Sequence, residues 1–201
     1  MSSSTGRRER PSVIVVTGPS GAGKGTLIKE LIERVPDLEV TVSATTRDQR
    51  PGELAGRDYW FLTPDEFLAK LEAGEFLEHV EYVSGHRYGT LLSELARIRG
   101  DGKIPLLELE TEGAQRVKAK VPGAVTIFIS AAVDELERRL RERATESSGE
   151  IGERIALAGK QLTQAGEFDY VVENDDLERA VDDLTELVRG LVAVAGTISR
   201  Q

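Results

Sequence analysis

The stretch VIVVTGPSGAGKGTLIKELIERV (residues 13–35) decides the fold. It opens with four β-branched residues, Val13 to Val16, which are typical of a strand buried on both faces of a sheet. A glycine-rich loop follows, and apolar residues then recur at helical spacing from Leu27 to Val35. The order strand, glycine loop, helix indicates the first unit of an α/β fold.

The glycine loop indicates a phosphate site. Gly18 to Lys24 match the first seven positions of the pattern GxxxxGK[ST], in which backbone N–H groups converge on phosphate oxygens and the lysine adds a positive charge. Position 25 is glycine where the pattern has Ser or Thr, and the hydroxyl comes one residue later, at Thr26. The alternative is a glycine-rich turn with a surface lysine. The strand before the loop and the helix after it favour the phosphate site.

The rest of the chain continues the alternation of strand-like and helical patterns. Strands are predicted at 40–43, 104–109, 125–129 and 170–172, and helices at 113–120, 133–144, 151–165 and 177–194. This alternation predicts a five-stranded parallel sheet flanked by helices, with ligands at the carboxyl ends of the strands.

Three segments stand apart from this core, which we place at residues 12–43 and 93–201. Residues 1–11 are small, polar and basic, and are interpreted as a disordered leader. Residues 44–92 break the alternation and indicate an inserted subdomain, in which Thr63, Pro64 and Glu66 predict a capped helix over 64–71. Residues 144–149 form a polar stretch, predicted to be a loop between two helices.

Composition excludes several classes of protein. The 26 Lys and Arg residues against 35 Asp and Glu give a net charge of −9, which argues against binding nucleic acid through bulk charge. The absence of cysteine excludes disulfides, thiolate metal sites and a cysteine nucleophile, and the two histidines, His79 and His86, are interpreted as structural or solvent-facing. Without a long apolar run or a signal peptide, the sequence predicts a cytoplasmic protein with no membrane segment.

A longer motif follows the second predicted strand. Arg47 and Arg50 are three residues apart and could converge on one phosphate, although taken alone they are equally typical of a solvated loop. They belong to the run Ser43-x-Thr-Thr-Arg47-x-x-Arg50-x-Gly-Glu53-x-x-Gly56-x-x-Tyr59-x-Phe61, which is followed by Glu78 and by Tyr88-Gly89-Thr90. Together with the glycine loop, this motif resembles the guanylate kinase family, and the similarity extends from about Val13 to Val188.

The resemblance implies an ATP:GMP phosphotransferase that gives ADP and GDP, in purine nucleotide metabolism and GMP recycling. It implies a P-loop core, a GMP-binding insert at 44–92 and a short lid at about 138–154. The implied partners are ATP, GMP and Mg²⁺, with no nucleic acid and no membrane, and the oligomeric state is left open.

The resemblance also implies roles for individual residues. Those implied to bind ATP are Gly18, Pro19, Ser20, Gly21, Ala22, Gly23, Lys24, Gly25, Thr26 and Asn174. Those implied to act in catalysis are Lys24, Arg139, Arg143 and Arg154. Those implied to bind GMP are Ser43, Arg47, Arg50, Tyr59, Glu78, Tyr88, Thr90 and Glu110, the last in place of the family's more common Asp. Thr26 and Glu108 are implied to support Mg²⁺, with Glu108 acting through water.

Plainer interpretations stay open for two of these groups. Arginines 138, 139, 141 and 143 lie near acidic residues at helical spacing, which is typical of a solvent-facing, salt-bridged surface. Asn174-Asp175 is equally typical of a turn. Ala144 stands where the family usually has Gly, a change that could stiffen the lid.

Three rival functions are weighed against this one. The first is another P-loop kinase of small metabolites, such as an adenylate kinase, which lacks the Ser43 to Glu53 motif. The second is a scaffold domain that resembles guanylate kinase but binds peptides, which would normally lack an intact glycine loop. The third is a regulatory NTPase with no acceptor nucleotide.

Overall fold

The computed structural model describes residues 10–82, 85–142 and 148–193. Residues 1–9 of the predicted leader, and residues 143–147 of the predicted lid, lie outside the described ranges. Where the described chain begins, Arg10 donates a hydrogen bond of 2.7 Å to Asp37, and Pro11 is buried.

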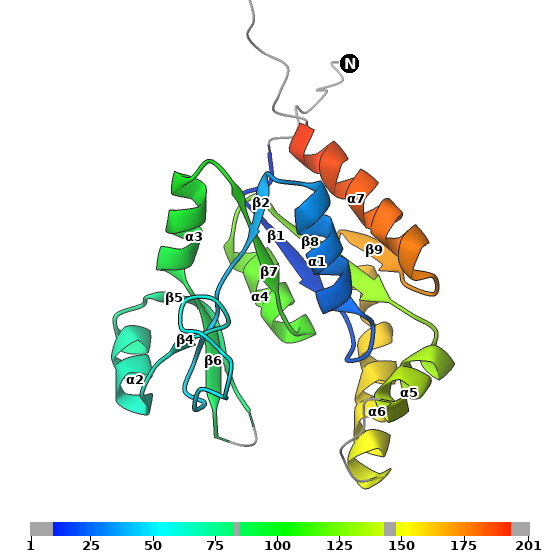
Figure 1. Cartoon of the computed structure of the whole chain (residues 1–201), viewed down its shortest axis with the longest axis horizontal. Helices are drawn as coiled ribbons and strands as arrows, with labels where there is room; N and C mark the ends of the chain where they lie inside the picture. Colours follow the sequence, from blue (N-terminus) through cyan, green and yellow to red (C-terminus); the bar gives the residue numbers. More distant parts are fainter. Residues whose placement is uncertain (1–9, 83–84, 143–147, 194–201) are drawn as a thin grey trace, which may run out of the picture.

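A parallel sheet forms the centre of the fold (Figure 1). Its strands are β1 (Val13–Thr17), β2 (Leu38–Val40), β7 (Ile104–Glu108), β8 (Ala124–Ser130) and β9 (Tyr170–Glu173), in the order β2-β7-β1-β8-β9. The predicted five-stranded parallel sheet is therefore confirmed. The helices outside the insert are α1 (Lys24–Arg34), α3 (Leu92–Gly100), α4 (Thr111–Lys120), α5 (Val133–Glu142), α6 (Ser148–Leu162) and α7 (Leu177–Ala193), with a 3-10 turn at Ala165–Glu167.

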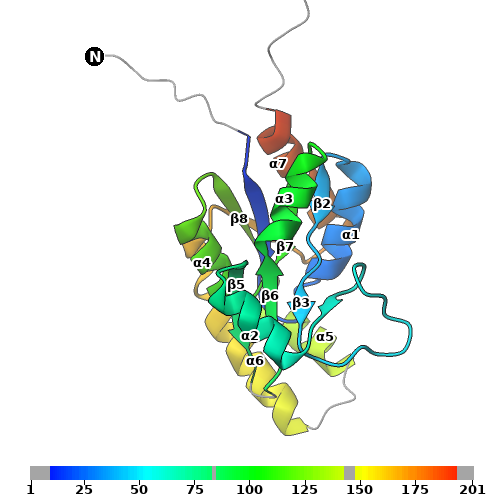
Figure 2. The ribbon, with the colours of Figure 1, turned by 90° about the vertical axis from the view of Figure 1, so that its left-hand side faces the viewer.

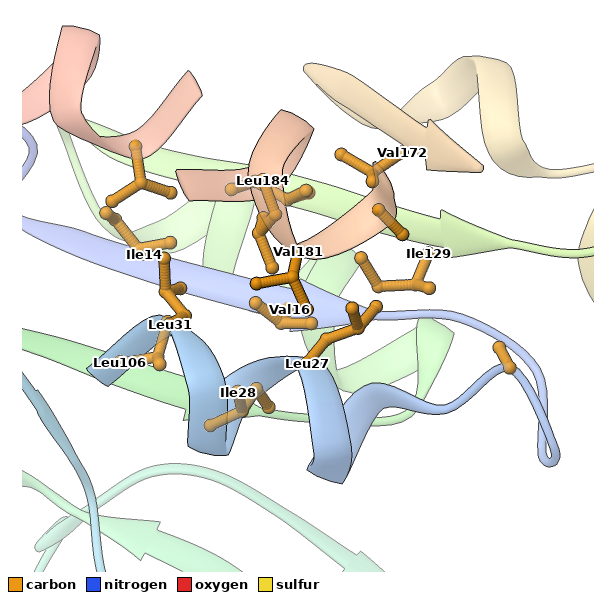
Figure 3. Close-up of a cluster of buried hydrophobic side chains, with 14 of the residues drawn as sticks. Ile14, Val16, Leu27, Ile28, Leu31, Leu106, Ile129, Val172, Val181 and Leu184 are labelled. Atoms are coloured by element: carbon orange, nitrogen blue, oxygen red, sulfur yellow. The ribbon is translucent and has the colours of Figure 1, made fainter. Parts of the chain in front are cut away.

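Burial on both faces explains why β1 consists of β-branched residues. Ile14 and Val16 pack on one face, in a cluster with α1 and α7 that Figure 3 shows in close-up. Val13 and Val15 pack on the other face, in a cluster that includes residues of α3 and α4. The four side chains from Val13 to Val16 are fully buried, which explains why these positions are apolar.

The second strand differs from the prediction over residues 40–43. The strand β2 ends at Val40, and the next strand, β3 (Ala44–Thr45), belongs to a different sheet. Thr41 donates the last hydrogen bond to the core sheet, from its backbone N to the Leu106 oxygen at 3.0 Å. Because the chain leaves the core at Val42, the run of β-branched residues is divided between two sheets.

Two helices also differ from the sequence prediction, one in its existence and one in its first residue. The helix α3 was not predicted, since its apolar repeat of Leu92, Leu95 and Ile98 is short and no side chain caps its start among the described residues. The helix α6 begins at Ser148, inside the stretch predicted as a loop over 144–149.

The insert forms a second sheet beside the core (Figure 2). Its strands run in the order β4 (Trp60–Phe61), β3, β6 (Arg87–Leu91), β5 (Phe76–Glu81), and α2 (Pro64–Glu72) packs against them. The helix α2 confirms the prediction over 64–71, because Thr63 Oγ1 accepts from Glu66 N at 3.2 Å and the Glu66 carboxylate accepts from Thr63 N at 2.7 Å. The buried Phe67 ring stacks on Phe76, with ring centroids 4.3 Å apart.

The arrangement places the glycine loop between two side units. Figure 1 shows the insert on one side of the carboxyl ends of the core strands and the pair α5 and α6 on the other. Within the described ranges, no helix has the length and apolar character that crossing a membrane requires.

Candidate functional site

The glycine loop connects β1 to α1 in a conformation that only glycine adopts easily. Gly18 has a φ of 139°, and a Cβ there would lie 2.2 Å from the Ile129 carbonyl oxygen. Gly23 has a φ of 85°, and a Cβ there would lie 2.4 Å from Asn174 Nδ2. Side chains at these two positions would push the loop away from its neighbours.

The N-terminus of α1 is open to an anion. No side chain caps this helix among the described residues, and its first turn contains no acidic residue. The first N–H groups of a helix lack partners within the helix and carry partial positive charge, so they favour a phosphate group. The loop and the helix therefore have the backbone geometry that a phosphate group would require.

The side chain of Lys24 folds back over the loop. Its Nζ donates to the carbonyl oxygens of Gly18 at 2.7 Å and Pro19 at 3.1 Å. Burial lowers the pKa of Lys24, while the nearby carboxylates of Glu110 and Glu108 act in the opposite direction. The lysine is thus a cation held at the loop, beside two acidic residues from the end of a neighbouring strand.

Strand register brings Glu108 to the start of the loop. Val16 of β1 is paired with Glu108 of β7, and Leu109 N donates to the Val16 oxygen at 3.1 Å. The surrounding protein raises the pKa of Glu108 by desolvation, and Lys24 opposes this shift. The residue is exposed to solvent, so its carboxylate lies outside the core, beside the glycine loop. Thr26, in the first turn of α1, is also exposed.

Two of the predicted lid arginines reach the loop. Arg139 donates to the Gly21 oxygen at 3.4 Å and to the Asn174 oxygen at 3.1 Å, and Arg154 donates to Ser20 Oγ at 2.7 Å. These contacts link α5 and α6 to the phosphate site over more than 100 residues of sequence. Arg143 lies outside the described residues.

Other arginines of α5 have the plainer role. Arg138 pairs with Glu135 and Glu142 and lies on the exposed side of the helix, and Arg141 pairs with Glu137. Hydrogen bonds from Arg138 and Arg139 lower the pKa of Glu135 to about 2. The salt-bridged surface is therefore correct for Arg138 and Arg141, whereas Arg139 also contacts the loop.

Asn174 supports the loop from behind. Its Nδ2 donates to the Ala22 oxygen at 2.7 Å, and the side chain is almost completely buried. Its Oδ1 has no hydrogen-bond partner among the described residues. The structure thus places Asn174 under the phosphate loop, a more specific arrangement than a surface turn.

The insert contributes a cationic cluster around Arg47. The Arg47 guanidinium donates to both carboxylate oxygens of Glu53, at 2.8 and 3.1 Å, and lies 5.4 Å from the centroid of the Tyr59 ring. Tyr59 in turn lies 5.9 Å from Tyr88, edge to face. Arg50 reaches Glu53 only through its backbone N, at 2.8 Å, and its side chain is exposed. The structure therefore brings together Arg47, Tyr59 and Tyr88, with Arg50 at the edge.

Glu78 is a buried carboxylate with one committed oxygen. Its Oε1 accepts from Thr90 N at 3.1 Å and from Thr90 Oγ1 at 2.8 Å, across the pairing of β5 with β6. Burial raises the pKa of Glu78, and the two bonds from Thr90 oppose this shift. Its Oε2 faces α4, because a Cβ on Gly113 would lie 3.4 Å from that oxygen. Oε2 accepts no hydrogen bond from the described residues, and this uncommitted oxygen lies where the insert meets the core.

The same junction contains Glu110 and Tyr82. Glu110 precedes α4, and its Oε2 accepts from Gln161 Nε2 at 3.3 Å. Partial burial, together with Glu110 and other neighbours, raises the pKa of Tyr82 to about 12, and Tyr82 packs edge-on against Tyr88 at 5.2 Å. Ser43, on the insert side, is half-buried, and its carbonyl accepts from Trp60 N at 2.8 Å.

Sequence reasoning missed three residues of the site. Glu53 holds Arg47, Tyr82 packs on Tyr88, and Gln161 contacts Glu110. Only Glu53 had a signal, because it lies in the same short motif, three residues after Arg50. Tyr82 and Gln161 fall in segments without a motif.

Comparisons with known proteins show the family to which the chain belongs. A family model described as guanylate kinase matches residues 9–191. The chain is 46% identical over 185 residues to a guanylate kinase from Rubrobacter xylanophilus, covering 92% of this chain and 96% of that one. It is 42% identical over 182 residues to a guanylate kinase from Lactococcus lactis, covering 90% and 88%. A crystal structure of guanylate kinase from Anaplasma phagocytophilum is similar, with a TM-score of 0.69 at 28% identity, covering 92% and 88%.

Proposed function

The chain belongs to the guanylate kinase family, and on that premise we propose that it transfers the γ-phosphoryl group of ATP to GMP, giving ADP and GDP. One observation carries the choice of acceptor. The buried Glu78 directs an uncommitted oxygen to the junction between the insert and the core, toward Gly113 of α4. A buried carboxylate in this position suits a base that presents hydrogen-bond donors.

The donor side consists of the phosphate loop and the two arginines that reach it. The loop N–H groups and Lys24 bind the ATP phosphates, and Arg139 and Arg154 neutralise charge on the transferring group. Asn174 acts through the loop, since its buried amide fixes the Ala22 carbonyl. For Arg143, the support is the family resemblance.

The acceptor side begins with the GMP phosphate. Arg47 donates to both oxygens of Glu53 through Nη2, while its Nη1 donates to the Asp48 carbonyl, and a doubly charged phosphate would replace the carboxylate as its partner. Tyr59 and Tyr88 flank the same guanidinium and can donate their hydroxyls, and Arg50 adds charge from the edge.

The guanine base would lie between Glu78 and Glu110. Their carboxylates can accept from the N1–H and the 2-amino group. The Thr90 hydroxyl donates its hydrogen bond to Glu78, so we assign Thr90 to holding the carboxylate rather than to donating to the base. Ser43, immediately before β3, completes the insert side of the pocket.

The residues beside the loop fit a magnesium ion that arrives with ATP. No group of three or more His, Asp or Glu side chains is arranged to hold a metal within residues 10–82, 85–142 and 148–193. Magnesium keeps several waters and uses one or two protein oxygens together with substrate phosphates, so a sparse set of hard donors suffices. Glu108, which is exposed beside the loop, would hold the ion through water, and Thr26 supplies a nearby hydroxyl. When bound, the ion would neutralise charge on the phosphates.

The chemistry needs positioning more than covalent participation. Phosphoryl transfer spreads negative charge over the transferring oxygens, and the cations at the loop can stabilise it. Water must be excluded from the phosphoryl group, which requires the insert and the lid helices to approach each other over the loop.

We expect Arg47→Ala to raise the KM for GMP by about 10- to 100-fold, because it removes a two-pronged, charge-assisted contact to phosphate. Arg50→Ala should have a smaller effect, since its side chain is exposed. Steady-state kinetics with each nucleotide varied in turn measure both values. Arg57→Ala is the matched control, because Arg57 is a more exposed arginine of the same insert, paired with Asp58. Equal weakening of ATP and GMP in Arg47→Ala would contradict its place in the acceptor pocket.

Closure should be visible in solution. Small-angle X-ray scattering is expected to give a smaller radius of gyration with GMP plus a nonhydrolysable ATP analogue than for the protein alone. CMP in place of GMP serves as the control, because it cannot engage both carboxylates. A radius that stays the same with both nucleotides bound would argue against two units closing over a fixed core.

A further inference from the structure

The insert is joined to the core by two crossings of the chain. In the first, Thr41 still donates to Leu106 of the core sheet at 3.0 Å, whereas Ser43 already accepts from Trp60 of the insert sheet at 2.8 Å. Val42 is the one residue between these two sets of bonds. The second crossing lies at Leu91-Leu92, where β6 of the insert ends and α3 begins.

The side chain of Glu94 binds across both crossings. It lies in the first turn of α3, and its Oε2 accepts from Val42 N at 3.2 Å. Its Oε1 accepts from the indole Nε1 of Trp60, on β4 of the insert, at 3.3 Å. The residue is only 4% exposed, so these bonds form in a site from which water is largely excluded.

Arg97 connects this carboxylate to the core sheet. Its guanidinium donates to both oxygens of Glu94, at 3.3 and 3.1 Å, and to Glu39 Oε1 at 2.6 Å. Glu39 belongs to β2 and also accepts from Lys103 at 2.8 Å. This network of hydrogen bonds therefore connects Trp60 of the insert and Val42 of the crossing to β2, the edge strand of the core sheet.

Burial alone does not account for a carboxylate at this position. Burial acts to raise the pKa of Glu94, yet the bonds from Arg97, Val42 and Trp60 together lower it. An ionised group therefore occupies a site where an apolar side chain would avoid the cost of desolvation. Unlike an apolar side chain, the carboxylate accepts directional hydrogen bonds. Its donors are Val42 at the crossing, Trp60 of the insert and Arg97 of α3.

Trp60 transmits this constraint into the acceptor pocket. The backbone N of Trp60 donates to the Ser43 carbonyl, and its indole donates to Glu94. Val42, the residue before Ser43, donates to the same carboxylate, so Ser43 is held between two partners of Glu94. The indole also covers Gly56, where a Cβ would lie 2.9 Å from the ring. Ser43 begins the insert side of the proposed guanine pocket.

We propose that Glu94 is a positioning residue that fixes the angle at which the GMP-binding insert leaves the core, and so sets the affinity for GMP. This role rests on the proposed function. A purely structural role would affect the binding of ATP and GMP alike. A positioning role affects GMP alone, because the phosphate loop connects β1 to α1 and takes no part in the network around Glu94. Changes to Glu94 should therefore affect the acceptor nucleotide and spare the donor.

The test compares Glu94→Gln, Trp60→Phe and the double variant with the native protein, at a temperature well below their unfolding transitions. Glutamine keeps the shape but has one acceptor oxygen in place of two, so we expect the KM for GMP to rise about 10-fold while the KM for ATP changes less than about twofold. Trp60→Phe removes only the indole donor and should raise the KM for GMP about threefold. The double variant should resemble Glu94→Gln, because both substitutions break the same contact.

The control is Asp101→Asn, which alters an exposed partner of the same Arg97, 3.9 Å away, and should leave both KM values unchanged. An unchanged KM for GMP in Glu94→Gln and Trp60→Phe, or an equal rise for ATP and GMP, would overturn the proposal. If Glu94→Gln does not fold, Trp60→Phe decides, because Trp60 is at the surface. The native protein is assayed first: without GMP-dependent ADP release, the proposed function itself fails, and the role of Glu94 with it.

Discussion

Lys24→Ala is expected to lose nearly all phosphoryl transfer while the protein stays folded. The lysine is the cation that lies directly on the phosphate loop, where it donates to the carbonyls of Gly18 and Pro19. Removing one preorganised charge from a site that excludes water lowers kcat by about 10³-fold or more. The fold should survive because the hydrophobic clusters on either side of β1 do not include this side chain.

Turnover and thermal unfolding of Lys24→Ala measure the two parts of this prediction. Lys29→Ala is the matched control, because it removes an exposed lysine from the same helix. We expect Lys29→Ala to keep native turnover and both variants to show a cooperative unfolding transition. Near-native turnover in Lys24→Ala would mean that the loop does not bind the ATP phosphates.

The second large effect concerns the base of the acceptor. Guanine presents N1–H and a 2-amino group as donors, whereas adenine presents an acceptor at N1 and no amino group at C2. AMP would leave the Oε2 of the buried Glu78 without a donor, since Thr90 occupies only Oε1, so we expect its kcat/KM to be about 10⁴-fold or more below that of GMP. IMP, which lacks only the 2-amino group, should fall between them.

Glu78→Gln tests the residue behind this selectivity. The substitution keeps the shape but replaces an accepting oxygen, so kcat/KM for GMP should fall by on the order of 2 to 4 kcal/mol, with ATP binding little changed. Glu81→Gln is the control, since Glu81 is an exposed carboxylate near the end of the same strand, paired with Arg87. A Glu78→Gln enzyme indistinguishable from native would show that the guanine pocket lies elsewhere.

The core could be predicted from sequence because its signals are local. The β-branched run of β1 is buried on both faces. The alternation of strands and helices indicates that the strands of the core sheet are parallel. The change of sheet at Val42 could not be predicted, because the bond that removes Val42 from the core comes from Glu94, 52 residues away. The helix α3 was missed for a related reason: it is held by the apolar cluster under β7 rather than by its own capping or repeat.

The residues of the candidate site were found through motifs, but their partners were not. The sequence placed Arg47 and Thr90 in a nucleotide site. The structure adds that Glu53 accepts hydrogen bonds from Arg47 and that the Thr90 hydroxyl donates a hydrogen bond to Glu78. Asn174 lies 152 residues from the Ala22 carbonyl that it binds. Such pairs depend on the register of the strands and on how the elements pack, which no short motif contains.

The central claim is that this chain transfers a phosphoryl group from ATP to GMP. The most direct test is a coupled assay that measures the ADP formed from ATP in the presence of Mg²⁺, with GMP, AMP, CMP or UMP as acceptor. We predict rapid release with GMP and release near background with the other three. Equal release with AMP would indicate a different P-loop kinase, and release without any acceptor would indicate an NTPase. No release with GMP would leave a binding domain without catalysis, and each of these three results would contradict the account.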